Sequence, residues 1–237
     1  MNRDIFQLSL YGVTFVGLLD GIMELSRIKE HGNFGIGAVE GLEGELTFVE
    51  DEFYHADQNG NTHKAYLYSK SPKMTVTEFI AEDNITIEKR VNFSDLKKEL
   101  IKVFPCSNYL YALKIKAKFD WVKLMSYPKQ IKPYPSIDKI ARNKKIDTIY
   151  KTEGYMIGFY TPVSLEDLCG PSWHFHFLDM DRNLGGHIID CSLSNISVQY
   201  QYKNCLNIKL PDNQEFYKCN LHGVKEQLEK IVSSFND

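Results

Sequence analysis

Three of the seven histidines in this chain, His174, His176 and His187, lie in one short stretch of the sequence. His174 and His176 are two residues apart, so in a β-strand both imidazoles point to the same face. The polar segment 179–186 contains an asparagine and two glycines, which tolerate the positive φ angles of a chain reversal. We therefore expect a returning strand to carry His187 back beside the other two. Three neutral imidazoles with an open fourth position form the donor set of a catalytic zinc or a similar divalent ion.

The same stretch also has a purely structural interpretation. A single histidine is usually a surface residue or a hydrogen-bonded member of the core. Trp173, Phe175 and Phe177 alternate with the histidines, and this alternation predicts that they face the core. Burying two imidazoles without partners in such an aromatic strand is costly. The pattern therefore favours a metal site over a structural one.

The composition is that of an ordinary globular protein, with 43% hydrophobic and 25% charged residues. A length of 237 residues suits one large domain or two small ones. The formal net charge of −3 favours neither nucleic acid nor an anionic membrane as a partner. The five cysteines are odd in number and form no CxxC motif, which favours reduced thiols in a cytoplasmic protein. The apolar run 8–19 is too short to span a membrane, and no A-x-A-like cleavage site follows it.

Short alternating strands, a few short helices and no regular βαβ pattern predict an α+β fold with mixed or antiparallel sheets. Residues 109–119 alternate as a strand, Ser94 is expected to cap a helix through 104, and 224–235 is expected to be a C-terminal helix. We expect an N-terminal α/β subdomain, 1–125, and a β-rich metal-binding subdomain, 126–237.

The glycine-rich segment 32–44 fits neither a GxGxxG nor a Walker pattern, so it is interpreted as hairpins rather than a nucleotide loop. Tight turns are expected at 43–44 and at 51–52. The segment 127–136 contains three prolines and is predicted to be extended. It is either a linker between subdomains or a wall of the site.

Several of these segments, in this order, resemble the alpha-acetolactate decarboxylase family over nearly the whole chain. The residues that carry the resemblance are Leu18-Leu19-Asp20-Gly21, His31-Gly32-Asn33-Phe34-Gly35-Ile36-Gly37, Gly41-Leu42-Glu43-Gly44-Glu45-Leu46, Phe53-Tyr54, Pro128-x-Gln130-x-x-Pro133-Tyr134, Gly158-Phe159-Tyr160-Thr161-Pro162, His174-x-His176-Phe177-x-Asp179 and Gly185-Gly186-His187. The histidine segment is the most specific of them.

The resemblance implies two sheet-containing halves, a homodimer, and a zinc (or other divalent metal) enzyme that converts 2-acetolactate to acetoin and carbon dioxide in acetoin biosynthesis. It implies that His174, His176 and His187 are the metal ligands. It also implies that Glu45 reaches the metal site and that a C-terminal glutamate, Glu226 or Glu229, lies near the metal.

One position departs from the pattern that the resemblance implies. Met125 stands where the family usually has an arginine, and methionine provides neither the charge nor the donors of a guanidinium. Lys123, Lys129 and Arg142 are the nearby candidates to compensate for it.

The chemistry of decarboxylation indicates what such a site must do. Loss of carbon dioxide from a 2-hydroxy-3-keto acid leaves an electron pair that the adjacent ketone accepts as an enediolate. A divalent cation acts there as a Lewis acid, and a carboxyl group, for which we choose Glu45, returns a proton. The alternatives are a degenerate homologue that binds metal or a small ligand without turnover, and a different lyase or isomerase on the same scaffold.

Overall fold

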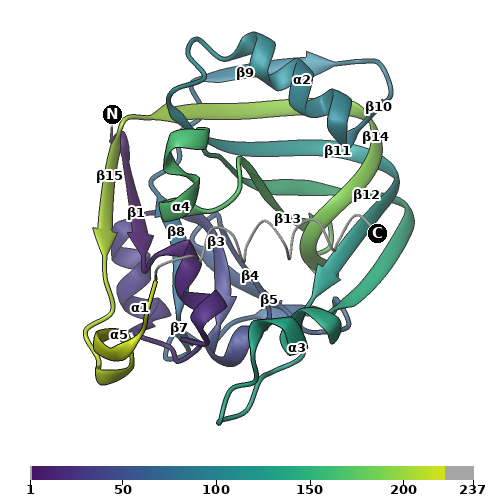
Figure 1. Ribbon diagram of the computed structural model, residues 1–237. Helices are drawn as coiled ribbons and strands as arrows, with labels where there is room; N and C mark the ends of the chain where they lie inside the picture. Colours follow the sequence, from purple (N-terminus) through teal and green to yellow (C-terminus); the bar gives the residue numbers. More distant parts are fainter. Residues whose placement is uncertain (1, 222–237) are drawn as a thin grey trace.

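The computed structural model of the chain describes residues 2–221, and two packed β-sheets with short helices at their margins make up this part (Figure 1). The first sheet has the order β15-β1-β8-β3-β4-β5-β6. Its strands are β1 (Asp4–Leu8), β3 (Phe34–Val39), β4 (Glu43–Val49), β5 (Glu52–Ala56), β6 (Thr62–Lys64), β8 (Lys73–Thr77) and β15 (Cys205–Lys209). A separate small pair joins β2 (Met23–Glu24) to β7 (Lys70–Ser71).

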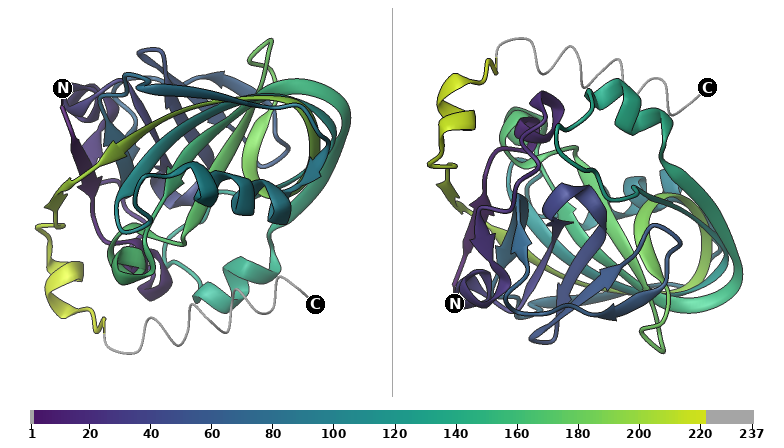
Figure 2. Two further views of the ribbon diagram at one scale, coloured as in Figure 1. Left: turned by 90° about the horizontal axis from the view of Figure 1, so that it is seen from above. Right: turned by 90° about the horizontal axis from the view of Figure 1, so that it is seen from below.

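The second sheet has the order β10-β14-β11-β12-β13, and β9 pairs with β14 beside this path. Its strands are β9 (Asp83–Ile87), β10 (Val91–Asn92), β11 (Leu110–Ser126), β12 (Lys145–Tyr160), β13 (Trp173–Asp179) and β14 (Gly185–Lys203). The long teal and green strands curl at one end of the molecule (Figure 2), where the pairing of β11 with β14 contains three register shifts. Such irregularities bend strands and increase their twist.

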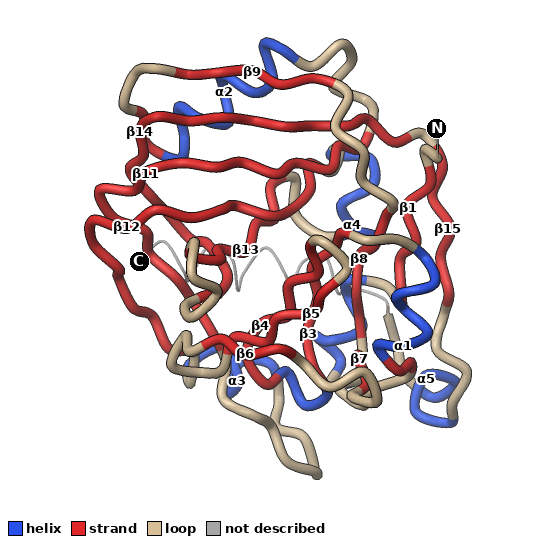
Figure 3. The backbone as a smooth tube through the Cα atoms, turned by 180° about the vertical axis from the view of Figure 1, so that it is seen from behind, coloured by secondary structure: helices blue, strands red, loops and turns tan. Residues whose placement is uncertain are grey.

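The helices are short and lie around the sheets (Figure 3). They are α1 (Leu25–Ile28), α2 (Phe93–Val103), α3 (Ile137–Arg142), α4 (Glu166–Cys169) and α5 (Gln214–Lys218), with 3-10 turns at Tyr11–Val16, Lys29–His31, Glu40–Leu42 and Val163–Leu165. No helix within residues 2–221 combines the length and the apolar character needed to cross a membrane. The predicted α+β class with mixed sheets is confirmed, since β1 and β15 run parallel and the other pairs are antiparallel.

The alternation predicted for 109–119 is confirmed, apart from its first residue. Tyr111, Ile115 and Phe119 are buried in the largest apolar cluster, against α2 and the aromatic face of β13. Leu110, on the opposite face of the same strand, packs between the two sheets. Tyr109 is exposed because it precedes the strand. One face of β11 thus fills the core under α2, and the other meets the first sheet.

Three predicted boundaries are wrong by one to three residues. The side chain of Asn92, rather than Ser94, caps α2 by accepting a hydrogen bond from the Asp95 amide. The reversal expected at 43–44 lies at Glu40–Leu42, and Glu43 already belongs to β4. The second turn uses Glu50 and Asp51, both with positive φ, and not Glu52. Polar residues one or two positions apart compete for the same cap or turn, and local sequence does not decide between them.

The predicted subdomain division at 125/126 coincides with the end of β11 and stays a prediction. Strands from both segments contribute to both sheets: β9, β10 and β11 lie in the second sheet, and β15 returns to pair with β1 in the first. The predicted C-terminal helix 224–235 lies outside the described residues.

Candidate metal centre

The three histidines come together on adjacent strands, as their spacing predicts. His176 of β13 pairs directly with His187 of β14, and His174 lies two residues earlier on β13. One ligand atom from each ring lies within 4.8 Å of the others. Among residues 2–221, this is the one group of three or more potential metal ligands so arranged. Trp173, Phe175 and Phe177 face the opposite apolar cluster, so the predicted two-faced strand is confirmed.

The turn between these strands is stabilised by the Asp179 carboxylate. Its Oδ1 accepts hydrogen bonds from the amides of Asn183 and Leu184, at 2.7 and 2.9 Å. Two residues of the segment have positive φ, Arg182 at 62° and Gly186 at 152°, so one of the expected glycines takes such an angle and an arginine takes the other. Gly185 has a different role, because a Cβ at this position would lie 3.0 Å from the Phe177 carbonyl oxygen.

His176 provides a test of whether these residues fit a metal. Its side chain is fully buried, and its Nδ1 lies 3.1 Å from the Leu46 carbonyl oxygen, to which it donates. Its Nε2 has no hydrogen-bond partner among the described residues, and Glu45 Oε2 lies 3.2 Å from it. An unprotonated Nε2 and a carboxylate oxygen buried this close repel each other unless a proton or a metal cation lies between them. A divalent ion shared with the other two imidazoles fits this arrangement.

The electrostatics keep the other two imidazoles neutral, which is the form that binds metals. Burial lowers the pKa of His187 to about 4, with smaller lowering effects from His176 and Lys73 and an opposing effect from Glu45. Burial also lowers the pKa of His174 well below its usual value, helped by the charges of His187, His176 and Lys73. Both rings are therefore unprotonated at neutral pH.

A cavity of about 250 Å³ opens beside the histidines and lies between the two sheets. His174 and His187 line it from the second sheet, and Glu45 lines it from β4 of the first, with 8% of its surface exposed. Met125 also lines it, at the end of β11 and paired with His187. The structure thus places Met125 at the site where a charged residue was expected.

The other predicted site residues lie elsewhere. Lys123 is exposed on β11 and does not line the cavity. Lys129 is exposed and forms an ion pair with Glu43, with Nζ 3.0 Å from Oε2. Arg142, in α3, does not line the cavity either. Glu226 and Glu229 lie outside the described residues.

The proline-rich segment is a wall of the site. Tyr127 lines the cavity, and its carbonyl accepts a hydrogen bond from the Gly44 amide at 2.9 Å. The Gln130 amide donates a hydrogen bond of 2.8 Å to the Gly41 carbonyl. The segment is therefore fixed to the glycine turn that leads into Glu45.

Four polar residues of the cavity were not predicted: Tyr11, Thr14, Lys73 and Lys97. Burial raises the pKa values of Tyr11 and Tyr127, and the Glu45 charge raises them further, so both phenols remain protonated. A signal for Lys73 exists in the sequence, because the residues that alternate with Met74 and Val76 on this strand are all polar. No comparable signal marks Tyr11.

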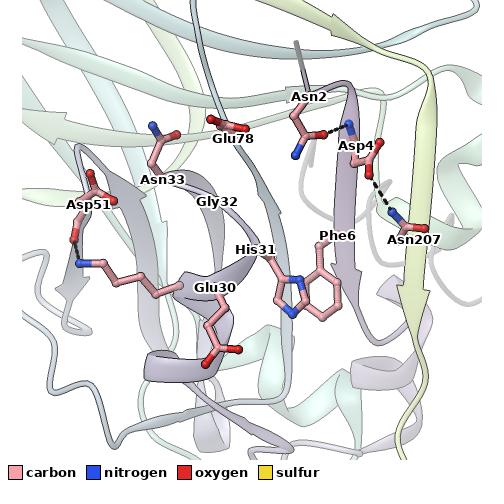
Figure 4. Close-up of a pocket in the computed structure, with 11 residues that line it drawn as sticks. Asn2, Asp4, Phe6, Glu30, His31, Gly32, Asn33, Asp51, Glu78 and Asn207 are labelled. Atoms are coloured by element: carbon pink, nitrogen blue, oxygen red, sulfur yellow. Dashed lines mark hydrogen bonds between the residues drawn. The ribbon is translucent and has the colours of Figure 1, made fainter.

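A larger groove of about 720 Å³ lies on a different part of the first sheet (Figure 4). Some of its polar groups are already engaged, since Lys29 donates to the Asp51 carbonyl at 2.7 Å and Asn207 donates to Asp4 at 3.4 Å. His31 stacks on Phe6 with 3.6 Å between the ring centroids. These side chains do not converge, so the smaller cavity beside the histidines is the candidate site.

Comparison with known proteins identifies relatives with the fold described above. The model of one protein family, described as alpha-acetolactate decarboxylase, matches residues 5–223. The alpha-acetolactate decarboxylase of Methanosarcina mazei is 30% identical over 96% of this chain and 79% of its own length. That of Bacillus licheniformis is 31% identical over 91% of this chain and 88% of its own length. The crystal structure of the Bacillus subtilis strain 168 enzyme superposes with a TM-score of 0.92 at 30% identity, covering 96% of this chain and 98% of that one.

Proposed function

We propose, from the premise that this chain belongs to the alpha-acetolactate decarboxylase family, that it is a carboxy-lyase that converts 2-acetolactate to acetoin and carbon dioxide. The observation that carries the proposal is the buried Nε2 of His176, unpartnered among residues 2–221 and aimed at the same point as the other two imidazoles and Glu45. A site that holds a cation beside a small polar cavity suits a keto acid that can chelate this cation.

We further propose that His174, His176 and His187 hold a divalent ion, with zinc as the first choice for three imidazoles. When bound, that ion supplies Lewis-acid stabilisation of the charge that develops on the substrate oxygens. The hydrogen bond from His176 to Leu46 fixes the tautomer of this ring and leaves Nε2 free for the ion. The chain's own contribution is therefore three imidazoles held on one strand pair, with the pKa values of His174 and His187 lowered by burial.

Glu45 is the proposed proton donor. The reaction consumes one proton, so Glu45 must take one up from solvent before this step. Once carbon dioxide leaves, the electron pair is held as an enediolate, and the protonated Glu45 can then deliver its proton to one face of the carbon. Glu45 lies against the histidines and faces the cavity, and the phenols of Tyr11 and Tyr127 line the same space. Burial of these groups excludes bulk water, so the proton that reaches the carbon comes from a fixed position.

The test is acetoin formation from racemic 2-acetolactate by zinc-loaded protein, beside the same protein stripped by a chelator. Turnover by the loaded sample and its loss in the stripped one are expected. His174→Ala should abolish both metal retention and turnover, and His63→Ala, on the exposed surface of the first sheet, should change neither. Turnover that survives complete chelation would contradict the metal-dependent reaction.

Met125 supports a second candidate function. Its uncharged side chain lines the cavity, with 8% of its surface exposed, and no guanidinium occupies that position. A homologue that binds metal or a small ligand without turnover would show stoichiometric metal and no acetoin. Met125→Arg is then the variant to build, and restored turnover would identify the lost charge as the cause.

The homodimer, the cytoplasmic location and the place in acetoin biosynthesis stay predictions. Sedimentation of the purified protein tests the first of them. A different lyase or isomerase activity would appear as turnover of a related 2-hydroxy-3-keto acid and none of 2-acetolactate.

A further inference from the structure

Lys73 and Glu45 lie on the same face of the first sheet, on either side of Ala38. Ala38 of β3 pairs with Lys73 of β8, and Gly37 beside it pairs with Leu46, the residue after Glu45. All three side chains line the cavity. Only the methyl group of Ala38 separates Lys73 from Glu45, so both longer side chains extend past Ala38 towards the histidines of the second sheet.

The ammonium group of Lys73 has no ion-pair partner among the described residues, although the charge of Glu45 acts on it. Its Nζ lies 4.2 Å from the centroid of the Tyr11 ring, and no hydrogen bond or ion pair engages it there. Its charge lowers the pKa values of His174 and His187, which shows that it acts on the metal-site side of the cavity. Burial lowers the pKa of Lys73 itself to about 8, and the negative charge of Glu45 opposes this shift.

The second cation of the cavity, Lys97, is placed differently. Its Nζ lies 3.8 Å from the centroid of the Phe93 ring on the same helix, and the charge of Asp190 opposes the lowering of its pKa by burial. Asp190 of the second sheet thus acts on Lys97, as Glu45 acts on Lys73. Met125 contributes no charge, and Lys123 does not line the cavity. Lys73 is distinguished by its position on the same sheet face as Glu45, which lies 3.2 Å from His176.

We propose that Lys73 binds the carboxylate of the substrate and so orients the 2-hydroxy-3-keto acid in the cavity. The assignment of the ligand as such an acid rests on the proposed function. An ammonium group is a compact charge with three donors, suited to one carboxylate in a confined space. The neutral product lacks the carboxylate and loses this contact. The ion pair therefore belongs to the bound substrate, and its removal should raise KM more than it lowers kcat.

The test uses a pair of unreactive ligands of the same shape: 2,3-dihydroxy-2-methylbutanoate and its carboxamide. Neither has the ketone that decarboxylation requires, and only the first carries a charge. Isothermal titration calorimetry on zinc-loaded protein at pH 7 gives both affinities. In Lys73→Met, affinity for the carboxylate ligand should fall about tenfold or more, because a buried charge pair is lost. Affinity for the carboxamide should stay within about twofold.

Two further variants complete the design. Lys73→Arg keeps the charge and should retain most of the preference for the carboxylate over the carboxamide. Lys70→Met removes an exposed charge three residues away, outside the cavity, and should leave both affinities unchanged. Lys73→Met is expected to fold, since methionine keeps the apolar stem against Tyr11 and removes a partly buried charge; Lys73→Gln serves if it does not.

Equal weakening of both ligands in Lys73→Met, or no weakening of either, would overturn the proposal. Because neither ligand reacts, this result can be read even if the wild-type protein makes no acetoin. The proposed decarboxylase function fails instead if the wild-type protein distinguishes the two ligands but forms no acetoin. Where turnover is present, a raised KM with kcat within about threefold is the matching kinetic result.

Discussion

At the scale of single residues, the site is defined by atoms that lack a partner. His176 donates from Nδ1 to a main-chain carbonyl and leaves Nε2 without a hydrogen bond among the described residues, with Glu45 3.2 Å from it. Lys73 brings an ammonium group into the same cavity without an ion-pair partner among these residues. Unsatisfied buried groups are costly, and a folded protein keeps them where a ligand completes them.

Glu45→Gln separates proton transfer from metal binding. The amide keeps the size of the side chain and its place beside the histidines but is not an acid. We expect acetoin formation to fall by about 10²- to 10⁴-fold while zinc stoichiometry, measured on the same samples, is retained. Glu43→Gln is the control, since Glu43 pairs with Lys129 outside the cavity. An active Glu45→Gln protein would remove Glu45 from the catalytic role.

The metal-free protein should lose stability in mild acid. The pKa of His187 is about 4 in the fold and about 6.5 in the unfolded chain, so the unfolded state binds more protons between these values. The free energy of unfolding should therefore fall as pH drops from about 6.5 towards 4. Melting temperatures of chelator-treated protein across this range test it, and the slope should be smaller in His187→Gln. An equal slope in both proteins would assign the effect to other groups.

At the scale of elements, Gly44, the second residue of β4, sets the position of Glu45. Gly44 has φ 59°, and a Cβ there would lie 1.9 Å from the Ala56 carbonyl oxygen on β5. Its amide also donates to Tyr127 of the proline-rich wall. Glycine is therefore required both for the backbone angle and for the close approach of the neighbouring strand.

Gly44→Ala should lower the melting temperature far more than Gly17→Ala. Both glycines have positive φ, 59° and 80°, but a Cβ at Gly17 would meet nothing within 4 Å. The strain of the backbone angle alone is worth roughly 1 kcal/mol, so the difference between the two variants measures the clash. Thermal unfolding followed by circular dichroism gives both values. Equal losses would show that β4 and β5 separate easily.

At the scale of the whole molecule, the site joins two sheets. The histidines belong to β13 and β14 of the second sheet, and Glu45 and Lys73 belong to β4 and β8 of the first. The apolar residues between the sheets, among them Ile36 and Phe159, hold these two sides at a fixed separation. A ligand that contacts both sides is bound only when the sheets are packed together.

Metal removal should therefore lower the stability of the whole described fold, and not only that of the histidine hairpin. A ligand present at a hundred times its Kd stabilises the folded state by about 2.7 kcal/mol. Loading the chelator-treated protein with zinc should raise the melting temperature in a single shifted transition. The same addition to His174→Ala should have little effect. A second, unshifted transition would show that the two sheets unfold independently.

The sequence by itself determined the parts that depend on local periodicity. The period-two spacing of His174 and His176 fixed their common face, and the alternating aromatic residues fixed the buried one. The family resemblance, built on short ordered motifs, identified Glu45 as a member of the site. These features are local because a strand sets the direction of each side chain from its neighbours alone.

Only the tertiary structure decided which faces meet across the cavity. Lys123 lies two residues from Met125, which pairs with His187, yet its side chain proved exposed. Lys73 is far from His174 in the sequence, yet it proved to line the site. The reason is that β3, β4 and β8 reach the histidines through packing of one sheet on the other, and no local pattern encodes that approach. The positions of turns and caps were likewise decided by competition between neighbouring polar residues within the folded chain.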